Sequence, residues 1–364
     1  MKKLFALLLL LALVLTLTGC PPQDYTPTNP SPSNPPSATR EELKVHFIDV
    51  GQADCILLES CGEFALIDGG NVEDSSLVVS YLQKQGVEEL EAVFCSHAHE
   101  DHVGGLPGVL AVFPTKAVYA PTRTYSSKCF DDFVYYTDQQ GLTIQIPGPA
   151  HSESVGMANI SVLGPVKSYA DPNNTSLVLL VTFRETSFLF TGDMEIQAEN
   201  DMLEFWGDRD FWDIDVLKVG HHGSDTSTGY RFLNTIMPEY GVISVGAGNS
   251  YGHPHELPLS RLRDADVTLY RTDLLGNILV TSDGKNLEFT WEKGSNQPQN
   301  PEEILPDPTR PSEEEDTIYI GNKNSKKLHL PTCSSLPKES NRVEFASYEE
   351  AIAAGYTPCG ICMK

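Results

Sequence analysis

The chain has 364 residues, with 50 acidic and 25 basic side chains and a formal net charge of −25. This length allows one sizeable domain and a second, smaller one. So large an acidic excess argues against a broad electrostatic footprint for nucleic acid. It leaves room for a local cationic site, because a bound metal ion can be the largest charge in a pocket.

The chain begins with two lysines and an apolar run from Leu4 to Leu17, followed by "LTGC" ending at Cys20. This run is short for a membrane span and is typical of a secretory signal. "LTGC" resembles the lipobox of bacterial lipoproteins, which implies cleavage before Cys20 and a lipid on its thiol. We therefore expect residues 1–20 to be a lipoprotein signal peptide and the mature protein to lack a transmembrane helix. The alternative is an ordinary cleaved signal in which Cys20 has no role.

Residues 21–41 are rich in Pro, Ser, Thr and Asn and contain almost no apolar side chains. Such a segment cannot bury enough surface to offset its loss of conformational entropy, so we expect a disordered tether. A tether after a lipidated cysteine predicts a secreted bacterial protein, lipid-anchored on the extracellular face of the cell membrane.

Residues 42–293 alternate short apolar runs with helical candidates, of which Leu77 to Gln85 and Glu195 to Phe205 are the clearest. Most runs end at a polar or glycine-rich turn that carries the unusual residues. The pattern predicts an α/β domain with a site on the loops at one sheet edge. A polar linker over 294–316 and a compact module over 317–364 follow. The strand-like runs are "KVHFIDV", "CILLES", "FALIDGG", "AVFCSH", "SLVLLVTF", "SFLFTGD" and "DVLKVG".

Directly after the run "AVF", the chain carries an HxHxDH pattern made of His97, His99, Asp101 and His102. Imidazole nitrogens and carboxylate oxygens are the non-sulfur ligands that zinc prefers. His97 and His99 are spaced to reach one ion. Asp101 and His102 begin a helix and are placed to face a second ion ~3.5–4 Å away. A structural role for all three histidines is the alternative, and their clustering disfavours it.

The HxHxDH pattern resembles the signature of the metallo-β-lactamase superfamily, which implies an αββα sandwich with metal ions at one sheet edge. By this resemblance, Asp68 in "LIDGG" lies near the metal ions and contacts their ligands without binding an ion itself. Asp193 in "FLFTGD" is the carboxylate that bridges the ions. "VLKVGHHGS" offers His221 and His222, one of which matches the last metal-binding histidine. We favour His221, because it directly ends the strand. Asp101 and Asp193 are the expected catalytic carboxylates.

One departure from the superfamily concerns a further histidine that many members carry before the bridging aspartate. His151 lies in a polar loop that does not match this position, where the chain instead has "DPNNTSLVLL". Asn173, Asn174 or Ser176 would be a poor zinc ligand, and Asn174 and Ser176 are better suited to hydrogen-bond a substrate oxygen. The resemblance thus implies one or two zinc ions, with manganese as an alternative.

A closer resemblance rests on "FIDVGQADCILL", "NNTSLVLL", "VGHHGS" and "SVGAGNSYGHP". Together these are similar to the extracellular hydrolase domain of the ComEC family of DNA-uptake competence proteins. The resemblance implies hydrolysis of phosphodiesters, with DNA as the substrate and binding partner. Lys218, His222, Ser224 and His253 are candidates for holding phosphate oxygens, although a lone Lys or Ser is more often surface or turn chemistry.

Two other functions remain open from the sequence. The first keeps the metal ions but changes the substrate to a phosphocholine or teichoic-acid phosphodiester of the cell wall. The second is a surface binding protein with a degenerate hydrolase site, which the missing histidine leaves possible. The oligomeric state is not indicated by any feature of the sequence.

The C-terminal module contains an H-x3-C pair, His329 and Cys333, and a C-x2-C pair, Cys359 and Cys362. This spacing predicts a structural zinc site in which all four ligands come from the protein. So small a module has too little core to fold stably without a cross-link such as a bound metal ion. The alternative is a disulfide or redox pair between Cys359 and Cys362. The module resembles the Ada-type metal-binding domain found at the ends of secreted nucleases. Its six basic and four acidic side chains, a net +2, make it the expected nucleic-acid contact.

Overall fold

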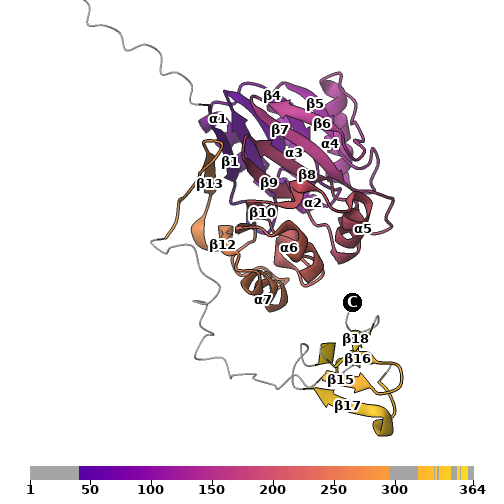
Figure 1. Ribbon diagram of the computed structural model, residues 1–364. Coiled ribbons are helices and arrows are strands. Elements are labelled where there is room, and N and C mark those ends of the chain that lie inside the picture. The colour runs from indigo at the N-terminus through magenta and orange to yellow at the C-terminus, as the bar shows by residue number, and fades with distance from the viewer. Residues whose placement is uncertain are drawn as a thin grey trace, which may run out of the picture.

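The computed structural model describes residues 41–294 and, in the C-terminal module, residues 319–331, 333, 336–345, 351–352 and 354–359. The N-terminal domain is built on two seven-stranded sheets (Figure 1). In the first sheet the strand order is β14-β13-β1-β2-β3-β4-β5. Its strands are β1 (Leu43–Phe47), β2 (Ile56–Ser60), β3 (Glu63–Ile67), β4 (Leu90–Phe94), β5 (Thr115–Tyr119), β13 (Ile278–Ser282) and β14 (Leu287–Trp291).

The second sheet has the order β12-β11-β10-β9-β8-β7-β6. In both sheets one part is antiparallel, and the part that leads to the site is parallel: β3 to β5 in the first and β9 to β12 in the second. The strands are β6 (Ser152–Val155), β7 (Ala158–Gly164), β8 (Val178–Phe183), β9 (Thr186–Phe190), β10 (Val216–Lys218), β11 (Tyr240–Ile243) and β12 (Thr268–Arg271).

The domain has four layers, helices, sheet, sheet and helices, and an apolar core lies between each pair of neighbouring layers. The central core lies between the sheets and takes side chains from both, such as Phe94 of β4 and Phe190 of β9. The outer cores join the first sheet to α1 (Ser75–Lys84), α3 (Leu106–Val112) and α4 (Lys128–Gln139), and the second to α5 (Ile196–Trp206), α6 (Tyr230–Ile236) and α7 (Glu256–Asp264). The expected αββα sandwich is confirmed. The short helices are α2 (Glu100–Val103) and α8 (Thr272–Leu275), with 3-10 turns η1 (Val72–Asp74), η2 (Asn173–Thr175), η3 (Asp210–Trp212) and η4 (Gly220–Gly223).

The strands read as continuous apolar runs because each inner strand is covered on both faces. In β4, Ala92 and Phe94 point into the central core, whereas Val93 points into the core under the helices. The two helices expected from the sequence are present as α1 and α5, with ends that differ by one or two residues. α1 ends where Gly86 takes a positive φ of 80°, a conformation that glycine adopts at no steric cost.

The described part of the C-terminal module is a four-stranded sheet in the order β17-β15-β16-β18. Its small core consists of Leu328, Phe345, Ala351 and Tyr356. Four side chains are few for an independent fold, which agrees with the need for an additional cross-link. Across the described residues, none of the helices combines the length and apolarity needed to span a bilayer. The elements are β15 (Tyr319–Asn322), β16 (Lys327–His329), η6 (Glu339–Asn341), β17 (Arg342–Phe345) and β18 (Thr357–Pro358).

Candidate metal centre

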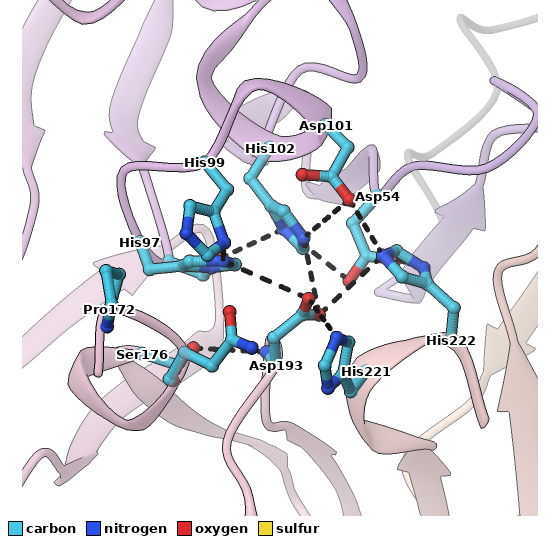
Figure 2. A network of polar contacts seen from close by, with 12 residues as sticks. Asp54, His97, His99, Asp101, His102, Pro172, Ser176, Asp193, His221 and His222 are labelled. Atoms are coloured by element: carbon cyan, nitrogen blue, oxygen red, sulfur yellow. Dashed lines mark hydrogen bonds and ion pairs between the residues drawn. The ribbon is translucent and has the colours of Figure 1, made fainter. Parts of the chain in front are cut away.

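The ends of three strands bring the candidate ligands around one point, and Figure 2 shows their side chains. His97 and His99 follow β4, Asp193 follows β9, and His221 and His222 lie in η4 directly after β10. Parallel strands of a sheet deliver their carboxyl ends to one edge, and here the edges of the two sheets face each other. Residues from distant parts of the sequence are thereby brought together.

Four side chains, here called the His102 group, meet most closely: Asp101, His102, Asp193 and His222. Their ligand atoms all lie within 4.8 Å of one another. His102 Nε2 is 3.3 Å from Asp193 Oδ1, and His222 Nε2 is 3.3 Å from Asp101 Oδ2. As expected, Asp101 and His102 stand at the start of a helix, α2.

The His102 group fits a bound divalent cation. His102 Nε2, His222 Nε2 and Asp193 Oδ1 are buried and have no hydrogen-bond partner within the protein. Buried polar atoms are normally paired, and each exception needs an explanation. Two imidazole nitrogens and two carboxylates converging on one point are a zinc-type donor set, which a cation would satisfy.

A second set, the His97 group, consists of His97, His99 and His221 around the other oxygen of Asp193. His97 Nε2 lies 3.0 Å from His99 Nδ1 and 3.9 Å from Asp193 Oδ2. His221 Nε2 lies 3.6 Å from the same oxygen. Among the described residues this set does not close to within 4.8 Å as the His102 group does. It is the more open of the two positions.

The sequence favoured His221 as the last metal-binding histidine, whereas in the structure it is His222 that belongs to the closed His102 group. Both residues have positive φ, 50° at His221 and 53° at His222. This left-handed backbone costs free energy for a non-glycine residue and is found mostly at functional sites. It turns the chain sharply after β10, so the buried His222 joins the His102 group, and His221, whose side chain is 22% exposed, faces the other oxygen of Asp193.

The electrostatics of the site favour a cation. Burial opposes a charge on His102, but the nearby carboxylates, Asp193 foremost, raise its pKa well above the usual value. Burial also opposes the charge on Asp193, yet the positive charges of His102 and His222 hold the pKa of its carboxyl well below its usual range. The carboxylates that stabilise a proton on His102 would therefore also stabilise a metal ion at this position.

His97 behaves differently. Burial, and then the charge on His102, lower the pKa of His97 well below its usual value. The ring is therefore neutral, as a metal ligand must be.

Asp68 orients His102, as the sequence led us to expect. Its Oδ2 accepts a hydrogen bond from His102 Nδ1 at 2.8 Å, while its Oδ1 accepts from the backbone N–H of Ser96 at 2.6 Å. His222 is held in the same manner, because its Nδ1 donates to the Ser244 carbonyl at 2.9 Å. Both rings therefore turn Nε2 towards the His102 group, and such outer partners fix the tautomer of metal-binding histidines.

Asp54, which sequence reasoning missed, lies directly behind these rings. It is 1% exposed, and its Oδ2 is 2.9 Å from Lys218 Nζ. The side chain of Lys218 is fully buried, so it cannot hold a substrate phosphate as expected from the sequence. The motif "VGQAD" contained Asp54, and its position after an apolar strand was the available signal.

Three other expected substrate contacts lie inside the protein. Ser176 Oγ accepts from Asp193 N and donates to a backbone carbonyl, and Asn174 bonds to Glu195 at both ends of its amide. These bonds shape the turn that carries Asp193, so neither side chain is available to a substrate oxygen. Ser224 is 4% exposed and contacts Thr226 instead.

His253 remains at the rim of the site. Its ring centre is 5.7 Å from that of His221 and 5.6 Å from that of Tyr251, which is 67% exposed. Its Nδ1 lies 3.2 Å from Gln52 Nε2. Beside it opens a cavity of about 510 Å³ with strongly acidic walls. Tyr251 and Gln52 line this cavity together with Asp49, Glu73, Asp74, Glu100 and Asp101.

A close backbone contact holds the motif against the first sheet. Gly69 donates its N–H to the His102 carbonyl at 2.7 Å. A Cβ atom on Gly105 would lie 2.0 Å from the Gly69 carbonyl oxygen, and one on Gly69 would lie 2.6 Å from Leu106 N. Only glycine fits at both positions, which brings His102 within reach of Asp68.

His151 has no part in the centre. Its Nε2 pairs with Glu153 Oε1 at 3.0 Å, and its ring packs beside Tyr119. No described residue therefore supplies a histidine from the position where many superfamily members carry one; η2 occupies that place.

In the C-terminal module, His329, Cys333 and Cys359 form a second candidate metal site. All three are buried, and His329 Nδ1 is 3.4 Å from Cys333 Sγ. One imidazole and two thiols within reach of one point are typical of a structural zinc site. The expected fourth ligand, Cys362, and the expected lipidation site, Cys20, lie outside the described residues.

The sandwich and its histidine-rich edge define a class of metal-dependent hydrolases. The model of the metallo-beta-lactamase superfamily matches residues 48–247, and the chain belongs to that superfamily. Residues 309–364 match the metal binding domain of Ada. Both agree with the expectations from the sequence, and together they suggest zinc.

Three relatives are similar to this chain beyond the shared fold. They are ComE operon protein 3 of Bacillus subtilis, 28% identical over 65% of this chain and 33% of the relative; competence protein ComA of Neisseria gonorrhoeae, 29% over 66% and 33%; and recombination protein 2 of Haemophilus influenzae, 31% over 68% and 30%. The resemblance to the ComEC family is confirmed. The chain matches about a third of the length of each of these relatives.

Proposed function

We propose that residues 42–293 form a metal-dependent phosphodiesterase that hydrolyses DNA. The observation that carries the proposal is the His102 group, in which three buried atoms (His102 Nε2, His222 Nε2 and Asp193 Oδ1) lack a hydrogen-bond partner and all four side chains face one another. The substrate class is supported by the relatives, two of which are named for competence and one for recombination.

The described residues suit such a reaction. When bound, a divalent ion polarises a phosphoryl oxygen and lowers the pKa of water from 15.7 to about 7. Asp193 turns Oδ1 to the His102 group and Oδ2 to the His97 group, so it can serve two ions. The Asp101 side chain is 31% exposed, which leaves it within reach of a proton on the substrate or the leaving group.

We assign His221 to the His97 group, where it would take the place of the missing histidine. Its Nε2 faces Asp193 Oδ2, and the left-handed turn at both histidines directs it away from His222. Zinc is the expected ion, with manganese as an alternative. The openness of the His97 group implies that its ion binds more weakly than the ion of the His102 group.

We also propose that the protein is a lipoprotein anchored at Cys20 on the extracellular face of the membrane. The support is the N-terminal sequence pattern, with its basic start, apolar run and lipobox-like end. The C-terminal module would bind zinc and contribute a nucleic-acid contact through its net positive charge.

A second candidate substrate is a phosphocholine or teichoic-acid phosphodiester of the cell wall. The specific observation is the acidic cavity beside the centre, which carries an exposed aromatic ring, Tyr251. Carboxylates and an aromatic face attract a quaternary ammonium group, whereas the carboxylates repel the phosphates of DNA. The complete His102 group favours either enzyme over a binding protein with a degenerate site.

The test compares three substrates with zinc or manganese added: bis(p-nitrophenyl) phosphate, a DNA oligonucleotide and p-nitrophenyl phosphocholine. Asp101→Ala and His99→Ala should abolish turnover of all that the wild-type protein cleaves, whereas the distant His151→Ala should not. Tyr251→Ala should reduce turnover of the choline ester alone if that ester is the substrate class. Wild-type activity in both Asp101→Ala and His99→Ala would sink the metal-hydrolase proposal.

A further inference from the structure

A buried ion pair lies beneath the candidate metal centre, formed by Asp54 from the loop after β1 and Lys218 at the end of β10. Asp54 Oδ2 and Lys218 Nζ are 2.9 Å apart, and both side chains are at most 1% exposed. Lys218 Nζ also donates to the Val219 carbonyl at 2.8 Å. The pair joins the two sheets at the point where the metal ligands converge.

Asp54 faces both histidines of the His102 group. Its Oδ1 is 3.4 Å from His222 Nδ1, and its Oδ2 is 3.9 Å from His102 Nδ1. These are the nitrogens on the far side of each ring from the metal-facing Nε2. Asp54 Oδ1 has no hydrogen bond, so Asp54 acts on the rings through its charge, while Asp68 and the Ser244 carbonyl accept their protons.

The backbone of Asp54 adds a third link to the centre. Its N–H donates to the Asp101 carbonyl at 3.1 Å, and its carbonyl accepts from Gly70 N at 2.8 Å. The residue thus touches Asp101, His102 and His222, three of the four members of the His102 group. A change in its charge or position would reach all three.

A buried carboxylate is costly without a compensating charge. Lys218 supplies that charge at Asp54 Oδ2, the oxygen that also lies 3.9 Å from His102 Nδ1. The Asp54 carboxylate lies on the Nδ1 side of both rings and supports the orientation in which each Nε2 faces the cation. Carboxylates behind metal-binding histidines act in this way, and their removal costs about 10–100-fold in metal affinity.

We propose that the Asp54–Lys218 pair is a positioning device that sets the metal affinity of the His102 group. The inference rests on the proposed metal centre, not on the identity of the substrate. Lys218 does not touch the ion or the substrate; it acts through Asp54, and Asp54 acts through His102 and His222.

The test uses the full chain and Mn²⁺, which avoids thiolate sites such as that of the C-terminal module. Electron paramagnetic resonance of unbound Mn²⁺ gives the dissociation constant, and the spectrum of the bound ion reports its surroundings. Asp54→Asn and Lys218→Met should each raise the dissociation constant of the tightest Mn²⁺ by about 10–100-fold. Lys116→Met, which removes an exposed lysine paired with Glu91, is the matched control and should bind as the wild type does.

The double variant Asp54→Asn/Lys218→Met separates positioning from simple stability. Removing both charges together should restore much of the melting temperature lost in Lys218→Met, because no unpaired buried charge remains. Its Mn²⁺ affinity should nevertheless stay low. If the double variant, or both single variants, bound Mn²⁺ like the wild type, the pair would be only structural and the proposal overturned.

The outcomes also distinguish this proposal from the metal centre on which it rests. A wild-type chain that binds no Mn²⁺ and no Zn²⁺ outside the C-terminal module would overturn both. If one of the single variants does not fold, the double variant still decides, since it leaves neither Asp54 nor Lys218 as an unpaired buried charge.

Discussion

Asp68 and His102 are 34 residues apart in the sequence, yet Asp68 Oδ2 lies 2.8 Å from His102 Nδ1. The bond links the end of β3 to the start of α2 across the first sheet. Since the other oxygen of Asp68 is held by a backbone N–H, the carboxylate cannot rotate without breaking a buried bond. His102 therefore presents Nε2 to the His102 group before any ion arrives.

Replacing Asp68 with Asn should weaken metal binding by about 10–100-fold while the fold is kept. An amide has one oxygen, which cannot accept from both His102 Nδ1 and Ser96 N. Titration with Zn²⁺ against a competing chelator measures the change. Asp201→Asn, whose carboxylate bonds to Tyr169 away from the centre, is the control. Equal affinity in Asp68→Asn and wild type would contradict an orienting role.

His222→Ala and His221→Ala should have different effects on metal content. His222 belongs to the closed His102 group, so its loss should remove the tightly bound ion of the hydrolase domain. Loss of His221 should affect only the weaker ion of the His97 group. Elemental analysis after dialysis against increasing chelator distinguishes them, with His151→Ala as the control. A tight ion lost from His221→Ala but retained in His222→Ala would reverse the assignment.

The buried carboxyl of Glu199 should make the free energy of unfolding depend on pH. Burial, partly offset by bonds from Gly229 N and Thr228 N, raises the pKa of its carboxyl from 4.5 to about 7. Between these values the folded state binds more protons than the unfolded state, so the free energy of unfolding falls as the pH rises through this window. The decrease is on the order of 3 kcal/mol at most.

Urea unfolding of wild type and Glu199→Gln from pH 4 to pH 8 checks this effect. The difference in free energy between the two should change across the window from about 4.5 to about 7 and be constant above it. Glu204→Gln, whose side chain is 69% exposed, should follow the wild type throughout. Parallel curves for Glu199→Gln and wild type would mean that the pKa of Glu199 is ordinary.

The isolated segment 317–364 should fold only when zinc is present. Its described core is four side chains, and zinc binding of about 10–16 kcal/mol in small modules is itself folding free energy. Circular dichroism with and without zinc, under reducing conditions, measures this. His329→Ala should need far more zinc to fold. A segment that folds only when oxidised would indicate a disulfide instead.

Cys20→Ala should release the protein from the membrane fraction or leave it unprocessed, because the thiol that would carry the lipid is gone. Fractionation followed by immunoblotting detects either outcome. A processed variant that remains on the membrane to the wild-type extent would contradict the lipid anchor.

The local sequence pattern predicted the fold and most of the candidate ligands, because short stretches of sequence carry these features. The HxHxDH motif and the apolar runs around it needed no knowledge of distant contacts. The choice between His221 and His222 could not be made from the sequence, because two successive residues with positive φ determine the side on which each ring lies. The prediction that Lys218 holds a substrate phosphate is wrong because the side chain is buried against Asp54 of the other sheet. The sequence around Lys218 does not indicate this burial, which depends on how the two sheets pack.

Asp54 was missed for a related reason. Its partner Lys218 is 164 positions away, and its position after an apolar strand is shared by the partly exposed Asp49 five residues earlier. Asn174 and Ser176 were expected to contact substrate because they stand where many superfamily members carry a histidine. In the structure both side chains instead accept hydrogen bonds from the backbone of the Asp193 loop.

The contact between Gly69 and Gly105 restricts how the motif can be moved by protein engineering. A chimera that takes its histidines from one homologue and its third strand from another must inherit glycine on both sides of the junction. With any larger residue at Gly105, the new Cβ would meet a carbonyl oxygen at 2.0 Å, and the helix start would be pushed away from the sheet. Transplanting HxHxDH alone would therefore carry over the ligands but not their alignment; the smallest transferable unit includes "DGG" and "HVGG" together.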